Sequence, residues 1–347
     1  MKKEKPKFRI AGRLIGQNYS PLVVAEIGIN HNGNFDRAIQ MIDDAYAAGC
    51  ECVKFQSHII ENEMIPNNVI PGNAKESIWK IMKRCAFSEK QEFALKKYVE
   101  SREMFYLCTP FSRAAAERLG KMKVKAYKIG SGECNNYPLV KHIASYQKPV
   151  ILSTGMNDLK SIYPAVKILR LARVSFALMH CTSIYPTPYK NVRLGALKEM
   201  ARHFPDAVLG LSDHSLGNYT CFAAVAYGAS ILEKHFTSDK HWPGPDVPIS
   251  MDTSELKDLI LGTRAIHAAL GGSKKILKEE RSTIHFAYAS VVSLRDIRKG
   301  ERLTKENIWV KRPGTGEIKA ADFEKVLDQI AIKNIRRDSA LKWGDFQ

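Results

Sequence analysis

The sequence predicts a closed barrel of eight parallel strands and eight helices, a (β/α)8 TIM barrel, followed by a small β-rich domain. From residue 21 to residue 272, short apolar runs alternate with amphipathic helical stretches. This rhythm is typical of a parallel sheet that is buried on both faces. Eight strand–helix units fit in the stretch, which matches the usual barrel length of about 250 residues. An open doubly wound sheet is the alternative.

The two ends of the chain have different patterns from the barrel stretch. Residues 273–285 are rich in charge and predict a linker, and residues 286–347 contain short β-type runs and tight turns. A domain as small as 286–347 buries little core by itself, so we expect it to pack on another surface. Residues 1–20 predict a basic tail and a short lid hairpin.

Each predicted strand is a short apolar run that ends in polar residues. The strands are expected at residues 21–28, 52–56, 105–108, 126–129, 150–153 and 176–181, with two more within 209–237. The helices are expected at residues 36–49, after Ser88, at 113–119, 138–145, 159–171, 194–204 and 254–270, with one between the last two strands. Gln91, three residues after Ser88, strengthens the prediction of a helix N-cap there. No glycine-rich nucleotide-binding loop opens the first helix, which counts against a nucleotide-binding fold.

Charge and cysteine content narrow the classes of function. The net charge is +17, but the basic residues are scattered, so solvation or an anionic small substrate explains the charge better than nucleic acid does. The seven cysteines form no C-x-x-C pair, and apolar surroundings indicate reduced thiols in a cytoplasmic compartment. Neither a signal peptide nor a membrane-spanning segment is visible, so we expect no membrane partner.

The stretch from Leu209 to Thr237 carries two histidines at predicted strand ends. His214 and His235 are 21 residues apart, which is about one βα repeat, so both would emerge at the carboxyl edge of the sheet. With Glu233 close by, the pair predicts a divalent metal of the Mn²⁺ or Mg²⁺ type, completed by water or substrate oxygens. The alternative is two unrelated histidines at strand ends.

Two lysines lie inside otherwise apolar predicted strands. Lys54 and Lys128 each need an anionic partner if they are buried. Hydroxyl groups at neighbouring strand ends would complete a cradle for a phosphate or a carboxylate; they are Thr109, Ser131, Ser153 and Ser212. Ion pairs with strand-end acids are the structural alternative, and a Schiff-base lysine is a third. Glu26, at the end of the first strand, suits either a general acid or base or a structural partner of Lys54.

Eight strings of the barrel stretch, taken together, resemble the sialic acid synthase family. They are EIGINH (26–31), IPGNA (70–74), TPFS (109–112), YKIGSGE (127–133), LSTGM (152–156), CTSIYP (181–186), GLSDHS (210–215) and EKHFT (233–237). The last domain, through KRPG (311–314), resembles that family's antifreeze-like (SAF) domain. The resemblance covers essentially the whole chain, and the combination of strings is specific where any one would be weak.

The resemblance implies that the protein condenses phosphoenolpyruvate with N-acetylmannosamine to give N-acetylneuraminate and phosphate, with cleavage of the carbon–oxygen bond. It implies that His214 and His235 bind a divalent metal, usually Mn²⁺, with Mg²⁺ or Co²⁺ as alternatives. The implied phosphoenolpyruvate contacts are Lys54, Thr109, Lys128, Ser131, Ser153 and Ser212; the implied sugar contacts are Gln56, Asn73, Tyr185 and Asp246. Glu26 and Glu233 are the implied catalytic residues.

The resemblance also implies a domain-swapped homodimer, in which Arg312 reaches the partner's sugar. Residues 70–74 and 132–136 are similar to synthases that use N-acetylmannosamine, and Ser57 stands where threonine is expected. Relatives that make legionaminic or pseudaminic acid use 2,4-diacetamido-trideoxy hexoses, so such a synthase is the closest alternative. A basic protein that binds nucleic acid or glycans, and a Schiff-base aldolase, are alternatives of other classes.

Overall fold

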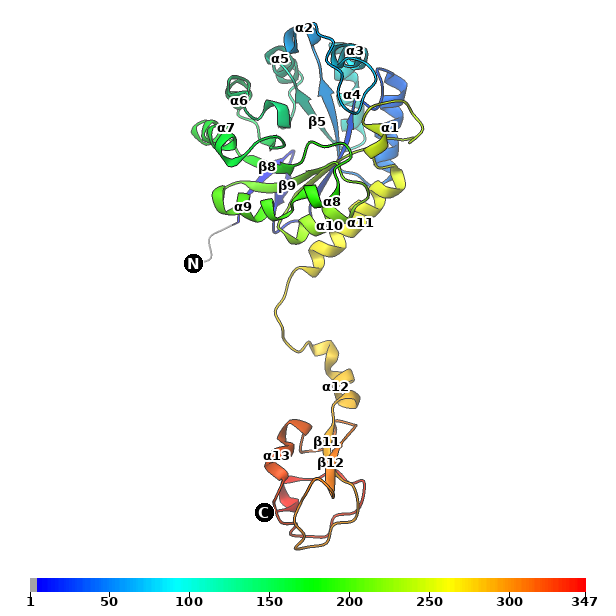
Figure 1. Ribbon diagram of the computed structural model, residues 1–347, viewed down its shortest axis with the longest axis vertical. Helices are drawn as coiled ribbons and strands as arrows, with labels where there is room; N and C mark the ends of the chain where they lie inside the picture. Colours follow the sequence, from blue (N-terminus) through cyan, green and yellow to red (C-terminus); the bar gives the residue numbers. More distant parts are fainter. Residues whose placement is uncertain (1–4) are drawn as a thin grey trace. The chain divides into compact units, whose positions relative to one another are not determined.

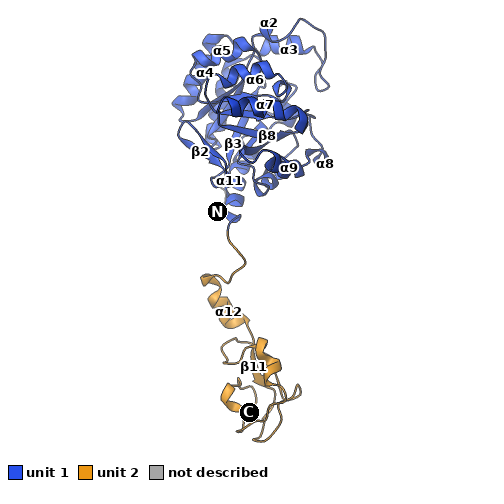
Figure 2. Cartoon of the chain, turned by 90° about the vertical axis from the view of Figure 1, so that its left-hand side faces the viewer, with its two compact units in different colours: residues 1–271 blue, residues 272–347 orange. Residues whose placement is uncertain are grey.

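The computed structural model describes residues 5–347. The chain divides into two compact units, Met1–Gly271 and Gly272–Gln347 (Figure 2). Each unit has its own cluster of buried apolar side chains. Within the described residues, no helix is both long and apolar enough to cross a membrane. All seven cysteines are buried and free.

The first unit is the predicted barrel of eight parallel strands. The strands are β3 (Leu22–Gly28), β4 (Cys52–Ser57), β5 (Phe105–Pro110), β6 (Tyr127–Ile129), β7 (Val150–Ser153), β8 (Phe176–Cys181), β9 (Val208–Asp213) and β10 (Ile231–His235). Their order in the sheet is β5-β4-β3-β10-β9-β8-β7-β6. β5 and β6, at the two ends of this order, also lie against each other, so the ring is nearly closed and the predicted fold class is confirmed.

Helices surround the strands (Figure 1). They are α1 (Phe35–Ala47), α2 (Ile60–Glu63), α3 (Ile78–Cys85), α4 (Glu89–Ser101), α5 (Arg113–Lys121), α6 (Tyr137–Ala144), α7 (Leu159–Leu171), α8 (Tyr189–Val192), α9 (Gly195–His203), α10 (Tyr219–Ala226) and α11 (Thr253–Ala269). The predicted capping box before α4 is confirmed, since the Ser88 and Gln91 side chains each bond to the other's backbone. The one-turn helix α2 lies in the long connection between β4 and α3.

The hairpin near the amino terminus consists of β1 (Lys7–Ile10) and β2 (Arg13–Gly16). Its apolar side chains Phe8, Ile10 and Ile15 belong to the same buried cluster as the first residues of the barrel strands, among them Leu22 and Ile231. The hairpin therefore closes the amino end of the barrel. The predicted hairpin is present, and its three buried apolar side chains place it at the end of the barrel opposite the carboxyl ends of the strands.

The second unit is small and contains one antiparallel pair of strands, β11 (Ser290–Ser293) and β12 (Ile308–Lys311). Isolated bridges and short turns complete it, including the one-turn helix α13 (Phe323–Val326). Residues 273–285 are not a plain linker, because helix α12 (Arg281–Ala287) begins within them. A buried cluster around Val291, Ile308 and Leu341 gives this unit a core of its own.

Candidate active site at the carboxyl ends of the barrel strands

The inward-facing rows of the barrel change from apolar to charged along each strand. Alternate residues of a strand point to the same side, so Val24 and Glu26 of β3 share a row, as do Ile231 and Glu233 of β10. The apolar members belong to the buried cluster near the amino ends. The charged members follow two residues later, at the carboxyl ends, which is where barrels carry their functional groups.

Glu233 lies at the centre of a buried network of charged side chains. Its Oε1 is 3.2 Å from Lys128 Nζ and 3.6 Å from Lys54 Nζ, and it accepts a hydrogen bond of 3.1 Å from Ser212. Lys54 also forms an ion pair of 2.7 Å with Glu26. The predicted lysines, acids and serine thus lie together, although they come from five different strands.

Two hydroxyl groups complete the surroundings of the lysines. Lys54 Nζ donates to Thr109 Oγ1 over 3.2 Å, and Lys128 Nζ donates to Ser153 Oγ over 2.7 Å. Ser131 has a different place: its Oγ accepts a hydrogen bond from the backbone N–H of Gly155 in the neighbouring turn. Both lysines form the ion pairs that were the structural alternative. They also contact the hydroxyl groups that the predicted anion site requires.

The electrostatic environments of the two lysines differ. Burial lowers the pKa of Lys54, but Glu233 and Glu26 outweigh it, so the pKa is raised overall. Burial also lowers the pKa of Lys128, and here Glu233 and the more weakly acting Glu26 do not compensate, partly because Lys54 repels the charge of Lys128. Burial raises the pKa of Glu233, but Lys128 and Lys54 together lower it below its ordinary value. A bound anion beside Lys128 would supply the negative charge that this lysine lacks.

The second carboxylate oxygen of Glu233, Oε2, is buried and lacks a hydrogen-bond donor among the described residues. A buried carboxylate oxygen without a donor is costly, so this atom suits a bound substrate group or water that donates to it.

The two histidines are neighbours, with ring centroids 5.4 Å apart. His214 Nδ1 donates to the Thr182 carbonyl over 2.9 Å, which leaves Nε2 as a metal-binding atom. His235 Nδ1 is buried and has no hydrogen-bond partner within residues 5–347; the Asp246 carboxylate lies 3.9 Å away. The Tyr185 ring packs against the His214 ring, with centroids 4.1 Å apart and planes tilted by 30°.

These histidines fit a labile divalent metal better than a closed structural site. In the described part of the chain, no group of three or more His, Cys, Asp and Glu residues is arranged as a metal cage. The protein would therefore supply two ring nitrogens, and substrate or water oxygens would supply the remaining ligands. The unpartnered Nδ1 of His235 is the observation that supports this fit.

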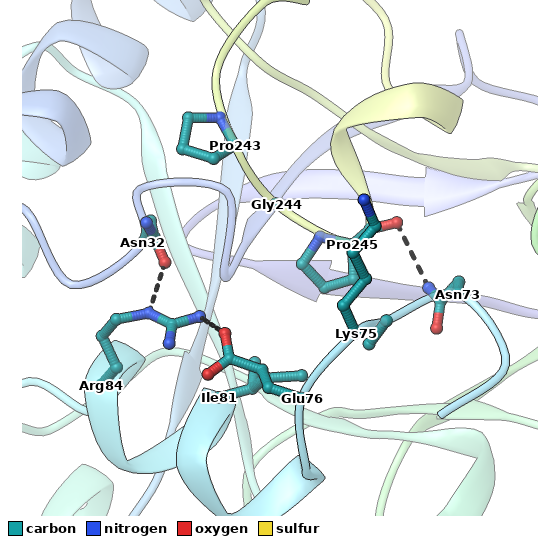
Figure 3. A pocket seen from close by; sticks show the side chains of 10 residues that line it. Asn32, Asn73, Lys75, Glu76, Ile81, Arg84, Pro243, Gly244 and Pro245 are labelled. Carbon is teal, nitrogen blue, oxygen red and sulfur yellow. Dashed lines mark hydrogen bonds and ion pairs between the residues drawn. The ribbon is translucent and has the colours of Figure 1, made fainter. Parts of the chain in front are cut away.

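The implied sugar contacts line the rim around the histidines. Gln56 Nε2 donates to Glu26 Oε1 over 3.0 Å, and Asn73 Nδ2 donates to Asp246 Oδ1 over 3.3 Å. Asn73 and Pro245 also border a pocket of about 620 Å³, on whose other side Arg84 bridges two more polar side chains (Figure 3). Arg312 follows β12 in the second unit and is exposed.

Two features of the site follow from loops that sequence patterns describe poorly. His58 is hydrogen-bonded to Gln56 on one side and to Glu63 on the other. In the sequence, these contacts are indicated only by a histidine that directly follows a polar strand end. Ser57 points the other way, since its hydroxyl donates to the buried Glu92. The hydroxyl at position 57 therefore has a structural role, whether serine or threonine carries it.

Comparison with known proteins identifies the family. Residues 41–275 match the model of the NeuB family, and residues 288–347 match that of the SAF domain. The chain belongs to the NeuB family. The resemblance to sialic acid synthases is thereby confirmed, and with it the class of enzyme, a phosphoenolpyruvate-dependent synthase of sugar acids.

Relatives of this NeuB-family chain are named after different sugar acids. The chain is 36% identical to the N,N'-diacetyllegionaminic acid synthase of Campylobacter jejuni, over 92% of this chain and 98% of the relative. It is 32% identical to human N-acetylneuraminate-9-phosphate synthase, over 93% and 90%. The crystal structure of a sialic acid synthetase from Leptospira borgpetersenii, in complex with citrate, matches with a TM-score of 0.74, 30% identity and coverage of 82% and 97%.

Proposed function

We propose that this NeuB-family enzyme condenses phosphoenolpyruvate with the open-chain form of N-acetylmannosamine, giving N-acetylneuraminate and phosphate. The observation that carries the proposal is the buried pair Lys54 and Lys128, flanked by hydroxyl groups, beside the histidine pair at one end of the barrel. A trianionic substrate needs buried cations and hydroxyl donors, and an aldehyde needs a nearby electrophilic centre. The two lysines and the hydroxyl groups suit the first need, and a metal held by the two histidines would meet the second.

The proposed roles follow from the contacts. Lys54, Lys128 and the hydroxyls of Thr109, Ser153 and Ser212 hold the phosphate and carboxylate of phosphoenolpyruvate, with Ser131 at the adjacent turn. Carbon 3 bonds to the sugar aldehyde carbon, a water oxygen bonds to carbon 2, and the bond between carbon 2 and the phosphate oxygen breaks. The water loses two protons: one passes through Glu26 or Glu233 to the aldehyde oxygen, which becomes a hydroxyl, and the other leaves with the phosphate.

The metal site is part of the proposal. A divalent metal, Mn²⁺ first and Mg²⁺ or Co²⁺ as alternatives, would be held by His214 and His235 and would polarise the aldehyde as a Lewis acid. Tyr185, Gln56, Asn73 and Asp246 orient the sugar around it.

We further propose a domain-swapped homodimer in the cytoplasm. The resemblance implies that Arg312 binds the sugar held by a partner subunit. Its exposure after β12 leaves the guanidinium available for such a contact. Substitution Arg312→Ala is expected to raise KM for the sugar and to leave KM for phosphoenolpyruvate unchanged.

A second sugar class has support from one observation. The diacetyllegionaminic acid synthase is 36% identical to this chain, so a 2,4-diacetamido-trideoxy hexose is the alternative acceptor. The test is a panel of N-acetylmannosamine, its 6-phosphate, and the legionaminic-type and pseudaminic-type precursors, each with phosphoenolpyruvate and Mn²⁺. We expect the highest kcat/KM for phosphate release with N-acetylmannosamine; release with none of the four would contradict the proposal.

Other classes make different predictions in the same preparation. A Schiff-base aldolase would be trapped by borohydride with pyruvate, through Lys54 or Lys128, whereas we expect no adduct. A nucleic-acid binder would bind DNA in a salt-dependent manner and would be indifferent to chelators, whereas we expect chelators to stop turnover.

A further inference from the structure

We propose that His58 and Glu63 are positioning residues that fix the orientation of the Gln56 carboxamide, and that this orientation sets the affinity for the sugar. The inference rests on the proposed function for the sugar contact of Gln56. In this proposal, His58 and Glu63 contact neither substrate and act on sugar binding through Gln56.

The four side chains form one continuous hydrogen-bonded chain. Gln56 Nε2 donates to Glu26 Oε1 over 3.0 Å, and Gln56 Oε1 is 2.9 Å from His58 Nε2. His58 Nδ1 is in turn 2.7 Å from Glu63 Oε2. This series of hydrogen bonds therefore connects the candidate catalytic carboxylate of Glu26, near the end of β3, through Gln56 of β4, to Glu63 of the one-turn helix α2.

The donors and acceptors in this chain agree with only one orientation of the amide. The carbonyl oxygen of Gln56 can only accept, so Nε2 of His58 must donate to it; the carboxylate of Glu63 can only accept, so Nδ1 of His58 donates as well. The reversed amide would place the Gln56 carbonyl oxygen against the Glu26 carboxylate, where neither group can donate. Glu26 thus selects this orientation of the amide, and the His58–Glu63 pair agrees with it when both ring nitrogens of His58 carry a proton.

The residues around His58 and Gln56 leave these two side chains little room to change their conformation. The His58 ring is 3% exposed and stacks on Phe111, with centroids 4.7 Å apart and planes 14° apart. Gly28 has a positive φ of 55°, and a Cβ there would lie 3.1 Å from Glu26 Oε1 and 3.3 Å from Gln56 Nε2. The backbone at residue 28 thus leaves room for the Gln56–Glu26 hydrogen bond, which a side chain there would crowd.

The functional consequence concerns the sugar more than phosphoenolpyruvate. With the amide fixed, Gln56 presents an N–H group beside Glu26 rather than a second acceptor, which suits the oxygen-rich face of a sugar. Lys54 contacts Glu26, Glu233 and Thr109, and none of these contacts involves His58. Loss of the positioning pair should therefore weaken sugar binding selectively.

The kinetic test uses His58→Phe, which can still stack on Phe111 but cannot donate a hydrogen bond. We expect KM for the sugar to rise by about tenfold or more, since a lost charge-assisted hydrogen bond has effects of this size, while KM for phosphoenolpyruvate stays within about twofold. His58→Gln retains an amide donor and should recover part of the loss. If His58→Phe does not fold, Glu63→Ala against Glu63→Gln replaces it, with the larger rise in sugar KM expected for alanine.

Ser57→Ala is the matched control, because Ser57 is equally buried in the same strand end but donates outward to Glu92. It should lower the melting temperature without the selective rise in sugar KM. Equal rises in both KM values for His58→Phe, or the same selective rise in Ser57→Ala, would overturn the positioning role.

A readout without substrate separates this inference from the proposed function. Nitrogen-15 NMR of labelled histidine, with His58 assigned by the signal lost in His58→Phe, should show a proton on both ring nitrogens. One unprotonated nitrogen would overturn the double-donor arrangement. Failure of the wild-type enzyme to consume phosphoenolpyruvate with any sugar would contradict the proposed function and leave the NMR outcome to decide the geometry.

Discussion

The two ends of the barrel are built on the same strands but hold different side chains. At the amino end, Leu22 and Ile231 pack against the hairpin residues Phe8 and Ile15 in an apolar cluster. At the carboxyl end, the same inward rows hold the charged network around Glu233. The amino end needs only shape and apolar area, whereas the carboxyl end needs matched charges and donors.

This difference separates stability from function along each strand. Apolar packing at the amino end stabilises the barrel by removing area from water. Buried ion pairs at the carboxyl end carry a desolvation cost that their attraction offsets only in part, as the lowered pKa of Lys128 indicates. Substitutions at the two ends should therefore have opposite effects on stability and turnover.

The largest expected effect is on the histidine pair. Substitution His214→Ala or His235→Ala should reduce metal-dependent turnover on the order of a thousandfold, since Lewis-acid polarisation is worth several kcal/mol. The melting temperature should change little in His235→Ala, because His235 Nδ1 has no hydrogen-bond partner among residues 5–347. It should fall further in His214→Ala, which loses the hydrogen bond to the Thr182 carbonyl. Phosphate release with and without EDTA checks this, and EDTA-sensitive turnover at the wild-type rate in both variants would refute the ligand assignment.

The next effect is on the lysine cradle. Lys128→Met should lower kcat/KM by about 10²- to 10³-fold, the usual result of removing one preorganised cationic or hydrogen-bonding group. The free energy of unfolding of this variant should fall by less than that of a variant in which a buried apolar side chain is truncated. The reason is that the buried ammonium group of Lys128 is incompletely compensated by its partners. Chemical denaturation and kinetics on one preparation provide the check; a large loss of stability with full activity would reverse the assignment.

The opposite outcome is expected at the amino end. Ile15→Ala removes a fully buried side chain of the hairpin and should cost about 3 kcal/mol of unfolding free energy. Its kcat/KM should stay within about twofold of wild type at a temperature where it is folded. A variant that is stable but inactive would show that the hairpin acts on the site.

The smallest effect is a pH dependence of stability. The folded-state pKa of Glu233 lies below its ordinary value of 4.5, because Lys128 and Lys54 outweigh burial. A depressed carboxyl pKa contributes stability above 4.5 that is lost as the pH falls toward the folded-state value. The difference in melting temperature between wild type and Glu233→Gln should therefore shrink from pH 7 to pH 3, and a constant difference would contradict the ion-pair network.

Regular periodicity explains why much of the site could be predicted from sequence. The barrel and the strand-end positions of Lys54, Lys128, His214 and His235 follow from short apolar runs and the rule that parallel strands end at one edge. The roles of Gln56, Asn73, Tyr185, Asp246 and Arg312 came from resemblance alone, because no local pattern distinguishes them from ordinary loop residues.

The remaining features depend on loop conformation and on competition between partners. His58 and Glu63 meet because α2 turns the chain after β4, within a stretch that shows no periodic pattern. The place of the hairpin at the amino end depends on which apolar surface Phe8, Ile10 and Ile15 find, and alternation alone does not specify it. Likewise, no sequence pattern specifies that Glu233 forms ion pairs with two lysines while Glu26 forms one with Lys54.

The most direct test of the central claim, that phosphoenolpyruvate and an amino sugar condense at the carboxyl end, follows one oxygen atom. Phosphoenolpyruvate labelled with oxygen-18 at the bridging position is incubated with N-acetylmannosamine, Mn²⁺ and the enzyme, and both products are analysed by mass spectrometry. We expect the released phosphate to carry the label and the new carbonyl oxygen of the nine-carbon acid to come from water. Label retained in the sugar acid, or no phosphate with any sugar of the panel, would contradict it.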